Sequence, residues 1–121
     1  MNTATLVLGA SVNENRYSNK AVRKLRAFEV ETFAIGASEG RILDVPIETV
    51  KKDYKNVHTV TLYLNPARQE AYYNYILALQ PKRVIFNPGT ENKEFIALLK
   101  EHGIEVELAC TLVLLATNQY R

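Results

Sequence analysis

Short apolar runs alternate with segments of helical period along this chain of 121 residues. The apolar runs are rich in β-branched and aromatic residues, which is typical of strands. The five predicted strands are Thr5–Gly9, Val30–Ile35, Val57–Leu64, Arg83–Phe86 and Ile104–Leu108. Between them, apolar residues repeat at the spacing of amphipathic helices. The predicted helices are Ser18–Ala27, Pro66–Leu79, a segment marked by Phe95–Leu99, and a short buried helix at Thr111–Ala116.

Strands that alternate with helices and are almost entirely apolar predict a parallel sheet covered on both faces. Because crossovers are right-handed, few topologies remain. We expect an α/β fold with a doubly wound, five-stranded parallel sheet in the order 3-2-1-4-5, in which Val57–Leu64 is the third strand. The stretch Ser38–Lys55 is less regular and predicts a short extended piece at Arg41–Val45 and a weak helix near Glu48–Lys52.

Composition narrows the class of protein without naming an activity. The length fits one domain, residues 1–121, and the net charge of +2 is too small to indicate nucleic-acid binding by itself. The single cysteine, Cys110, forms no internal disulfide, so nothing indicates an oxidising compartment. The longest apolar run, Leu112–Ala116, is too short to span a membrane, and no signal-peptide pattern begins the chain. We therefore expect a cytoplasmic protein without nucleic-acid or membrane partners.

The turn after the first strand holds the strongest candidate binding residues. Doubly wound sheets bind ligands beyond the carboxyl ends of their strands, and unpaired amides at a helix start attract phosphate. The candidates here are Gly9, Ala10, Ser11, Asn13, Arg16, Tyr17 and Ser18. They combine backbone amides, small polar groups and a cation, which is the mixture that phosphate recognition uses. A tight turn alone also explains Gly9, because the G-x-G-x-x-G fingerprint is absent, and Ser18 also suits a helix N-cap.

The ends of the other strands add a second set of candidates. Strand two ends in Ala34, Ile35 and Gly36, with no acid before Glu39. Nicotinamide sites usually carry Asp or Glu there to bind ribose hydroxyls, so this end disfavours a nicotinamide cofactor. The third and fourth strands are followed by Asn65, Pro66, Asn87, Pro88 and Gly89. These residues are typical of turns and helix starts, and they would also line a ligand crevice.

The residues do not predict a catalytic or metal site. Cys110 follows the last strand, whereas His58 and His102 lie at the other edge of the expected sheet. A cysteine nucleophile needs a base within hydrogen-bond reach, and a zinc site needs its ligands together. We therefore expect a binding protein rather than an enzyme. A smaller hypothesis places the Cys110 thiol in the crevice, where it would form a mixed disulfide with a ligand thiol under oxidation.

Several motifs resemble those of small stand-alone CoA-binding domain proteins. They are Leu8–Ser11, Arg16–Val22, Tyr63–Pro66, Phe86–Asn92 and Glu107–Leu112. The resemblance implies a Rossmann-like fold, similar to the CoA-binding domain of the succinyl-CoA synthetase alpha subunit, and coenzyme A as the ligand. It implies that the turn after the first strand lines the CoA phosphates. Ala34–Ala37 departs from the Val-Asn-Pro-like end that members carry on strand two, which concerns the adenine end of the site.

Three functions follow from these patterns. The first is binding of CoA or an acyl-CoA without catalysis. The second is an oxidoreductase or redox sensor that uses a nicotinamide dinucleotide on the same fold. The third is an interaction subunit that completes a larger CoA ligase, with Leu112–Leu115 as partner surface. Assembly into a homo-oligomer is also an open alternative.

Overall fold

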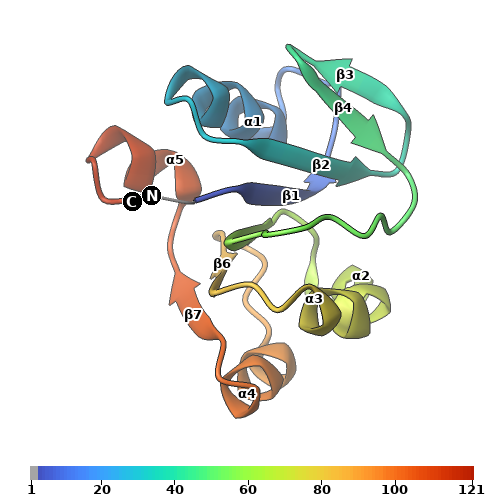
Figure 1. The fold of residues 1–121 in the computed structure, drawn as a ribbon, viewed down its shortest axis with the longest axis vertical. Coiled ribbons are helices and arrows are strands. Elements are labelled where there is room, and N and C mark those ends of the chain that lie inside the picture. Colours follow the sequence, from blue (N-terminus) through green and yellow to red (C-terminus); the bar gives the residue numbers. More distant parts are fainter. Residues whose placement is uncertain (1–2) are drawn as a thin grey trace.

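The computed structural model describes residues 3–121, which form one seven-stranded sheet between helices (Figure 1). The strands are β1 (Thr5–Ala10), β2 (Thr32–Gly36), β3 (Gly40–Ile42), β4 (Val45–Glu48), β5 (Thr59–Leu62), β6 (Arg83–Phe86) and β7 (Glu105–Leu108). The helices are α1 (Tyr17–Ala27), α2 (Pro66–Gln69), the 3-10 helix η1 (Glu70–Tyr72), α3 (Tyr73–Leu79), α4 (Lys93–Glu101) and α5 (Thr111–Ala116). The sheet order is β3-β4-β2-β1-β5-β6-β7.

The α/β class and the mainly parallel, Rossmann-like sheet are confirmed, but the predicted number and order of strands are wrong. The predicted third strand corresponds to β5, which pairs with β1 instead of lying outside β2. The position beside β2 belongs to β4, and β3 adds an antiparallel edge to it. Counted in chain order, the six parallel strands follow 3-2-1-4-5-6, which is the order of the Rossmann fold. The order reverses between β1 and β5.

The β3–β4 hairpin was missed because its sequence lacks the usual hairpin signals. Its turn uses Leu43 and Asp44, and Leu43 has a φ of 54°, where hairpins usually carry glycine or asparagine. Pro46 within β4 also argues against a strand. The predicted helix near Glu48–Lys52 does not form, because Glu48 ends β4 and the chain then crosses to β5 without a helix.

The helix predicted over Pro66–Leu79 is interrupted. Pro66 takes its first position, as expected, but α2 ends at Gln69 and η1 separates it from α3. The side chain of Gln69 is fully buried at this break. The chain leaves α3 through Gln80, whose φ of 51° ends the helix.

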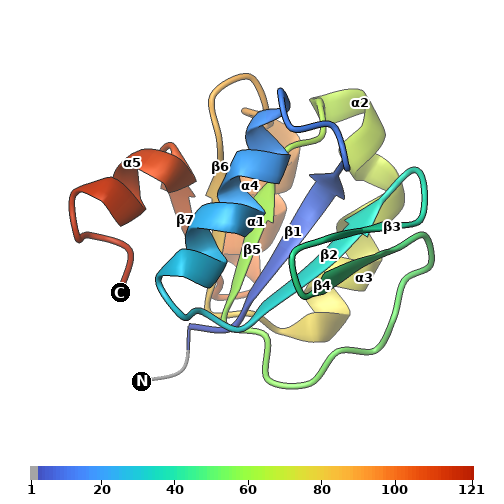
Figure 2. The same cartoon turned by 90° about the horizontal axis from the view of Figure 1, so that it is seen from above.

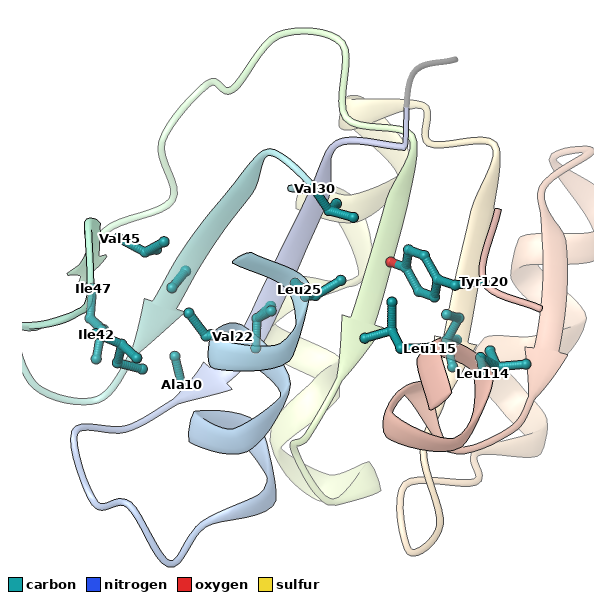
Figure 3. Packing of buried hydrophobic residues seen from close by; sticks show 13 residues of the cluster. Ala10, Val22, Leu25, Val30, Ile42, Val45, Ile47, Leu114, Leu115 and Tyr120 are labelled. Atoms are coloured by element: carbon teal, nitrogen blue, oxygen red, sulfur yellow. The ribbon is translucent and has the colours of Figure 1, made fainter. Parts of the chain in front are cut away.

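Two apolar clusters cover the two faces of the sheet. Helices α1 and α5 lie on one face, and α3 and α4 lie on the other (Figure 2). On the first face, Val22 and Leu25 of α1 pack near Leu114 and Leu115 of α5 (Figure 3). Residues alternate between the clusters along each inner strand, so both faces of the central strands are buried, as a parallel sheet requires.

A polar cluster lies at the amino edge of the sheet, on the face that α5 covers. Arg83 is 7% exposed, and its Nε donates a hydrogen bond of 3.1 Å to Oγ1 of Thr59. Its Nη1 lies 3.3 Å from a carboxylate oxygen of Glu107, and its guanidinium lies 4.5 Å from the ring centre of Tyr120. We call Arg83, Thr59, Glu107 and Tyr120 the amino-edge cluster. It attaches the C-terminal segment to the sheet.

Candidate functional site

A cavity of about 680 Å³ opens at the carboxyl edge of the sheet, where the strand order reverses. Its wall consists of the loop after β1, the start of α1, the end of β2 and the loops after β5 and β6. The lining residues are Gly9, Ala10, Ser11, Val12, Asn15, Arg16, Tyr17, Ser18, Ile35, Gly36, Ala37, Ser38, Tyr63, Leu64, Asn65, Arg68, Tyr72, Pro88, Gly89 and Thr90. This volume is in the range of small-molecule sites.

Gly9, near the end of β1, lets this part of the strand approach Tyr63, the residue after β5, closely. Its φ is +93°, and a Cβ there would lie 3.0 Å from the carbonyl carbon and oxygen of Tyr63. The β1–β2 register shifts between Leu8 and Ala10, so Gly9 forms a bulge that turns the chain out of the sheet. A side chain at this position would push the two walls of the cavity apart.

The loop between Gly9 and α1 is held by its own polar side chains. The Oγ of Ser11 accepts a hydrogen bond of 3.1 Å from the backbone N–H of Asn13, and Oδ1 of Asn13 accepts one of 2.9 Å from that of Asn15. The buried Asn19 donates through Nδ2 to the carbonyl oxygen of Ser11 at 2.8 Å. Asn13 therefore shapes the loop and does not itself line the cavity.

The first turn of α1 presents free backbone donors to the cavity. Within residues 3–121, the N–H groups of Tyr17 and Ser18 have no acceptor. The predicted N-cap role of Ser18 is wrong, because Arg16 occupies the N-cap position and Ser18 is a buried residue inside the helix. No side chain caps this end, so its amides and the helix dipole remain available to an anion.

The charge of the cavity wall is positive. Arg16 lines it from the start of α1 and Arg68 from α2, and no Asp or Glu is among the lining residues. Neither arginine side chain forms a hydrogen bond or ion pair with any residue in the described range 3–121. A cavity with two free guanidinium groups and free amides can bind a ligand that carries several negative charges.

Gly36 at the end of β2 leaves no room for the acid of a nicotinamide site. A Cβ at this position would overlap the carbonyl oxygen of Ala10 and would lie 3.1 Å from Cγ2 of Ile47. The close pairing of β1 and β2 therefore excludes any side chain here. Ala37 and Ser38 continue this neutral part of the wall.

The structure brings most of the predicted binding residues together. Of these, the cavity is lined by Gly9, Ala10, Ser11, Arg16, Tyr17, Ser18, Ile35, Gly36, Asn65, Pro88 and Gly89. Asn13, Ala34, Pro66 and Asn87 are not among the lining residues. Ala34 is a core residue, and Pro66 is the first residue of α2.

Asn87 is buried and its side chain is fully used within the protein. Its Nδ2 donates to Oγ1 of Thr61 at 2.7 Å and to the carbonyl oxygen of Leu62 at 2.9 Å. Its Oδ1 accepts a hydrogen bond of 2.9 Å from the backbone N–H of Thr111. It therefore joins β5, β6 and α5 below the cavity, a role that its sequence position did not reveal.

Several lining residues were not singled out from the sequence as binding residues. They are Val12, Asn15, Ser38, Tyr63, Leu64, Arg68, Tyr72 and Thr90. Arg68 lies three residues after Asn65. The Oδ1 of Asn65 accepts a hydrogen bond of 3.1 Å from the backbone N–H of Arg68. An N-cap asparagine at the carboxyl edge, followed by a cation in the same helical turn, is a signal that could have found it.

The side chains with potential for catalysis do not meet in the cavity. Cys110 is partly exposed but is not among the lining residues, so the structure does not bear out its expected place in the crevice, and its reaction with a ligand thiol is untested. Burial, and then the nearby Cys110, raise the pKa of Tyr63, whose hydroxyl has no partner among residues 3–121. His58 lies just before β5, and His102 follows α4. The described chain contains no group of three or more His, Cys, Asp or Glu side chains placed to hold a metal.

The segment Leu112–Leu115 is partly core. Leu114 and Leu115 are buried in the cluster on the α1 face, whereas Val113 is 55% exposed. Among residues 3–121, no helix has the length and hydropathy needed to cross a bilayer.

The strand order and the cavity at its reversal define a Rossmann-like α/β domain with an anion-attracting crevice. The chain belongs to the CoA binding domain family, whose model matches residues 3–116. The resemblance seen in the sequence motifs is therefore confirmed.

Solved structures agree with this assignment. The chain is similar to the crystal structure of an uncharacterized protein at 44% identity, with a TM-score of 0.95 and 98% of each chain covered. It is also similar to a structure from Thermus thermophilus, at 22% identity and a TM-score of 0.85, over 98% of this chain and 90% of that one. A hypothetical protein from Pyrococcus horikoshii matches at 19% identity and a TM-score of 0.83, over 93% of this chain and 80% of that one. The last two likenesses show the fold alone. No curated protein matches the chain.

Proposed function

We propose that this protein binds coenzyme A or an acyl-CoA in the cavity at the carboxyl edge, as one CoA-binding domain without catalysis of its own. The observation that carries the proposal is the wall of this cavity. It combines the free amides of Tyr17 and Ser18 with the unpaired guanidinium groups of Arg16 and Arg68 and contains no carboxylate. The membership of the chain in the CoA binding domain family supports the same ligand.

The proposed contacts follow the general rule for Rossmann-like sheets. The diphosphate would lie at the start of α1, the adenosine over the end of β2, and the pantetheine arm over the ends of β5 and β6. The contacting residues would be Gly9, Ala10, Ser11, Arg16, Tyr17, Ser18, Ile35, Gly36, Asn65, Arg68, Pro88, Gly89 and Thr90. The remaining candidates, Asn13, Ala34, Pro66 and Asn87, would act by supporting these walls.

Isothermal titration with CoA tests the proposal, and NADH fluorescence titration serves as the comparison. We expect binding of CoA at sub-millimolar concentration and weaker binding of NADH, because Gly36 stands where a ribose-binding acid would be. A folded protein that gives no heat with CoA would contradict the proposal. Preference for NADH would favour the nicotinamide alternative, and co-purification with a ligase subunit would favour the subunit alternative.

A further inference from the structure

Two fully buried amide side chains hold the walls of the cavity from opposite sides. Asn19 of α1 donates to the carbonyl oxygen of Ser11, and its Oδ1 accepts a hydrogen bond of 2.8 Å from Nε of Arg23. Gln69 at the end of α2 donates through Nε2 to two carbonyl oxygens, those of Leu64 and Thr90, each at 2.8 Å. Both amides are 0% exposed, so neither contacts a ligand directly.

Gln69 joins two loops that are distant in the sequence. Leu64 follows β5 and Thr90 follows β6, and both line the cavity. Because one NH₂ group bonds both carbonyls, Gln69 links the two loops directly, in addition to the link that Asn87 makes between β5 and β6. Loss of this group would leave both carbonyls without the donor that now joins them, and the two loops could then separate.

The orientation of the Gln69 amide is determined by Asn92. Nδ2 of Asn92 donates to Oε1 of Gln69 at 3.0 Å and to the hydroxyl of Tyr73 at 2.8 Å. A rotated Gln69 amide would place its oxygen against two carbonyl oxygens and its NH₂ group against another NH₂ group. Asn92 is itself held, because its Oδ1 accepts a hydrogen bond of 3.1 Å from the backbone N–H of Phe95 and caps α4.

We propose that Gln69, oriented by Asn92, is a positioning residue that sets the width of the β5–β6 half of the cavity, and that Asn19 does the same for the half beside α1. This inference rests on the proposed function. The α1 half would receive the diphosphate and adenosine, and the β5–β6 half would receive the pantetheine arm. Gln69 therefore controls the affinity that pantetheine adds, whereas Asn19 controls the affinity for the nucleotide part that CoA shares with ADP.

The test compares CoA with ADP, which lacks both the pantetheine arm and the 3′-phosphate of CoA. CoA binding is measured by isothermal titration, and ADP binding by amide chemical-shift titration, which reaches millimolar dissociation constants. We expect Gln69→Met to weaken CoA binding about tenfold and to leave ADP binding within about twofold. The matched variant Asn19→Ala, at the other buried amide, should weaken CoA and ADP by similar factors.

Two further variants test the same proposal if Gln69→Met does not fold. Asn92→Asp retains the helix-cap oxygen but loses the donor to Gln69, so it should lower the CoA-to-ADP affinity ratio in the same direction. Tyr73→Phe removes a hydroxyl from the same network without touching a loop carbonyl, so it should change thermal stability but not the ratio.

The outcomes separate the two proposals. If the wild-type protein binds CoA but Gln69→Met and Asn92→Asp leave both the CoA and the ADP affinity unchanged, the positioning role is wrong and the proposed function stands. If these variants weaken CoA and ADP equally, the division into two halves is wrong. If the folded wild-type protein binds no CoA, the proposed function fails and this inference fails with it.

Discussion

Arginine side chains mark both edges of the sheet, but their surroundings are opposite. At the amino edge, Arg83 is buried and meets Thr59, Glu107 and the ring of Tyr120. At the carboxyl edge, Arg16 is exposed and lines the cavity with no partner among residues 3–121. A buried cation needs hydrogen bonds and an opposite charge, whereas an exposed one keeps its capacity to bind. The first edge therefore serves stability, and the second is available for a ligand.

The two edges also differ in what forms them. Side chains from β6, β7 and the C-terminal segment close the amino edge. At the carboxyl edge, Gly9 and Gly36 allow main-chain groups of neighbouring strands to come close together. Loss of an arginine side chain should therefore have a different result at each edge: lost stability at the amino edge, and lost ligand binding at the carboxyl edge. The following predictions are ordered from the largest expected effect to the smallest.

The replacement Gly36→Val should have the largest effect. Its Cβ would overlap the carbonyl oxygen of Ala10, so β1 and β2 would separate at the floor of the cavity. We expect the free energy of unfolding to fall by about 3 kcal/mol and CoA binding to be lost. Urea unfolding and titration calorimetry measure the two effects. Gly103→Asn is the control, because nothing lies within 4 Å of its Cβ position and asparagine tolerates a positive φ. Equal effects of both variants would contradict the explanation.

The replacement Arg83→Met should separate stability from binding. It leaves the Glu107 carboxylate without its cation and removes the contact with Tyr120, so we expect a loss of about 2 kcal/mol in the free energy of unfolding. CoA affinity should not change, because Arg83 is remote from the cavity lining. A parallel fall in CoA affinity of the folded variant would show that the edges are coupled.

The replacement Arg16→Ala should give the reverse pattern. We expect CoA affinity to fall about tenfold, because a charge-assisted contact with phosphate is lost. The free energy of unfolding should stay within about 0.5 kcal/mol, because the side chain has no partner in the described chain. Lys93→Ala, an exposed charge outside the cavity, controls for net charge. Equal losses in the two variants would show that only overall charge matters.

A small pH effect on stability should arise at the amino edge. Burial, then the charges of Arg83 and Lys82, lower the pKa of His58, while Glu105 opposes them. As pH falls toward this lowered pKa, the unfolded chain binds more protons than the folded protein. The stability that neutral His58 contributes is therefore present above the ordinary pKa of about 6.5 and is lost as pH falls below it. Urea unfolding at about pH 7.5 and about pH 5.5 should show a smaller decrease for His58→Gln than for the wild type. An unchanged decrease would contradict the assignment.

Much of the fold could be predicted from local pattern. The strand at Arg83–Phe86 and the helix at Thr111–Ala116 have the predicted bounds, because apolar periodicity reports directly on burial. The β3–β4 hairpin could not be predicted, because its turn places Leu43 at a positive φ that leucine rarely adopts, and because Pro46 lies within β4. Once β4 takes the place beside β2, the next strand must pair with β1, which explains the wrong order.

By itself, the sequence determined the alternation of elements, the polar turn from Gly9 to Ser18 and the family, because these depend on neighbours along the chain. Only the tertiary structure decided that Arg68 shares the cavity wall with Arg16 and that Asn87 is buried beneath it. It alone showed that Gln69 joins two loops through one amide. The physical reason is that hydrogen bonds between distant segments depend on the strand order, and this order was set by a hairpin that has no local signal.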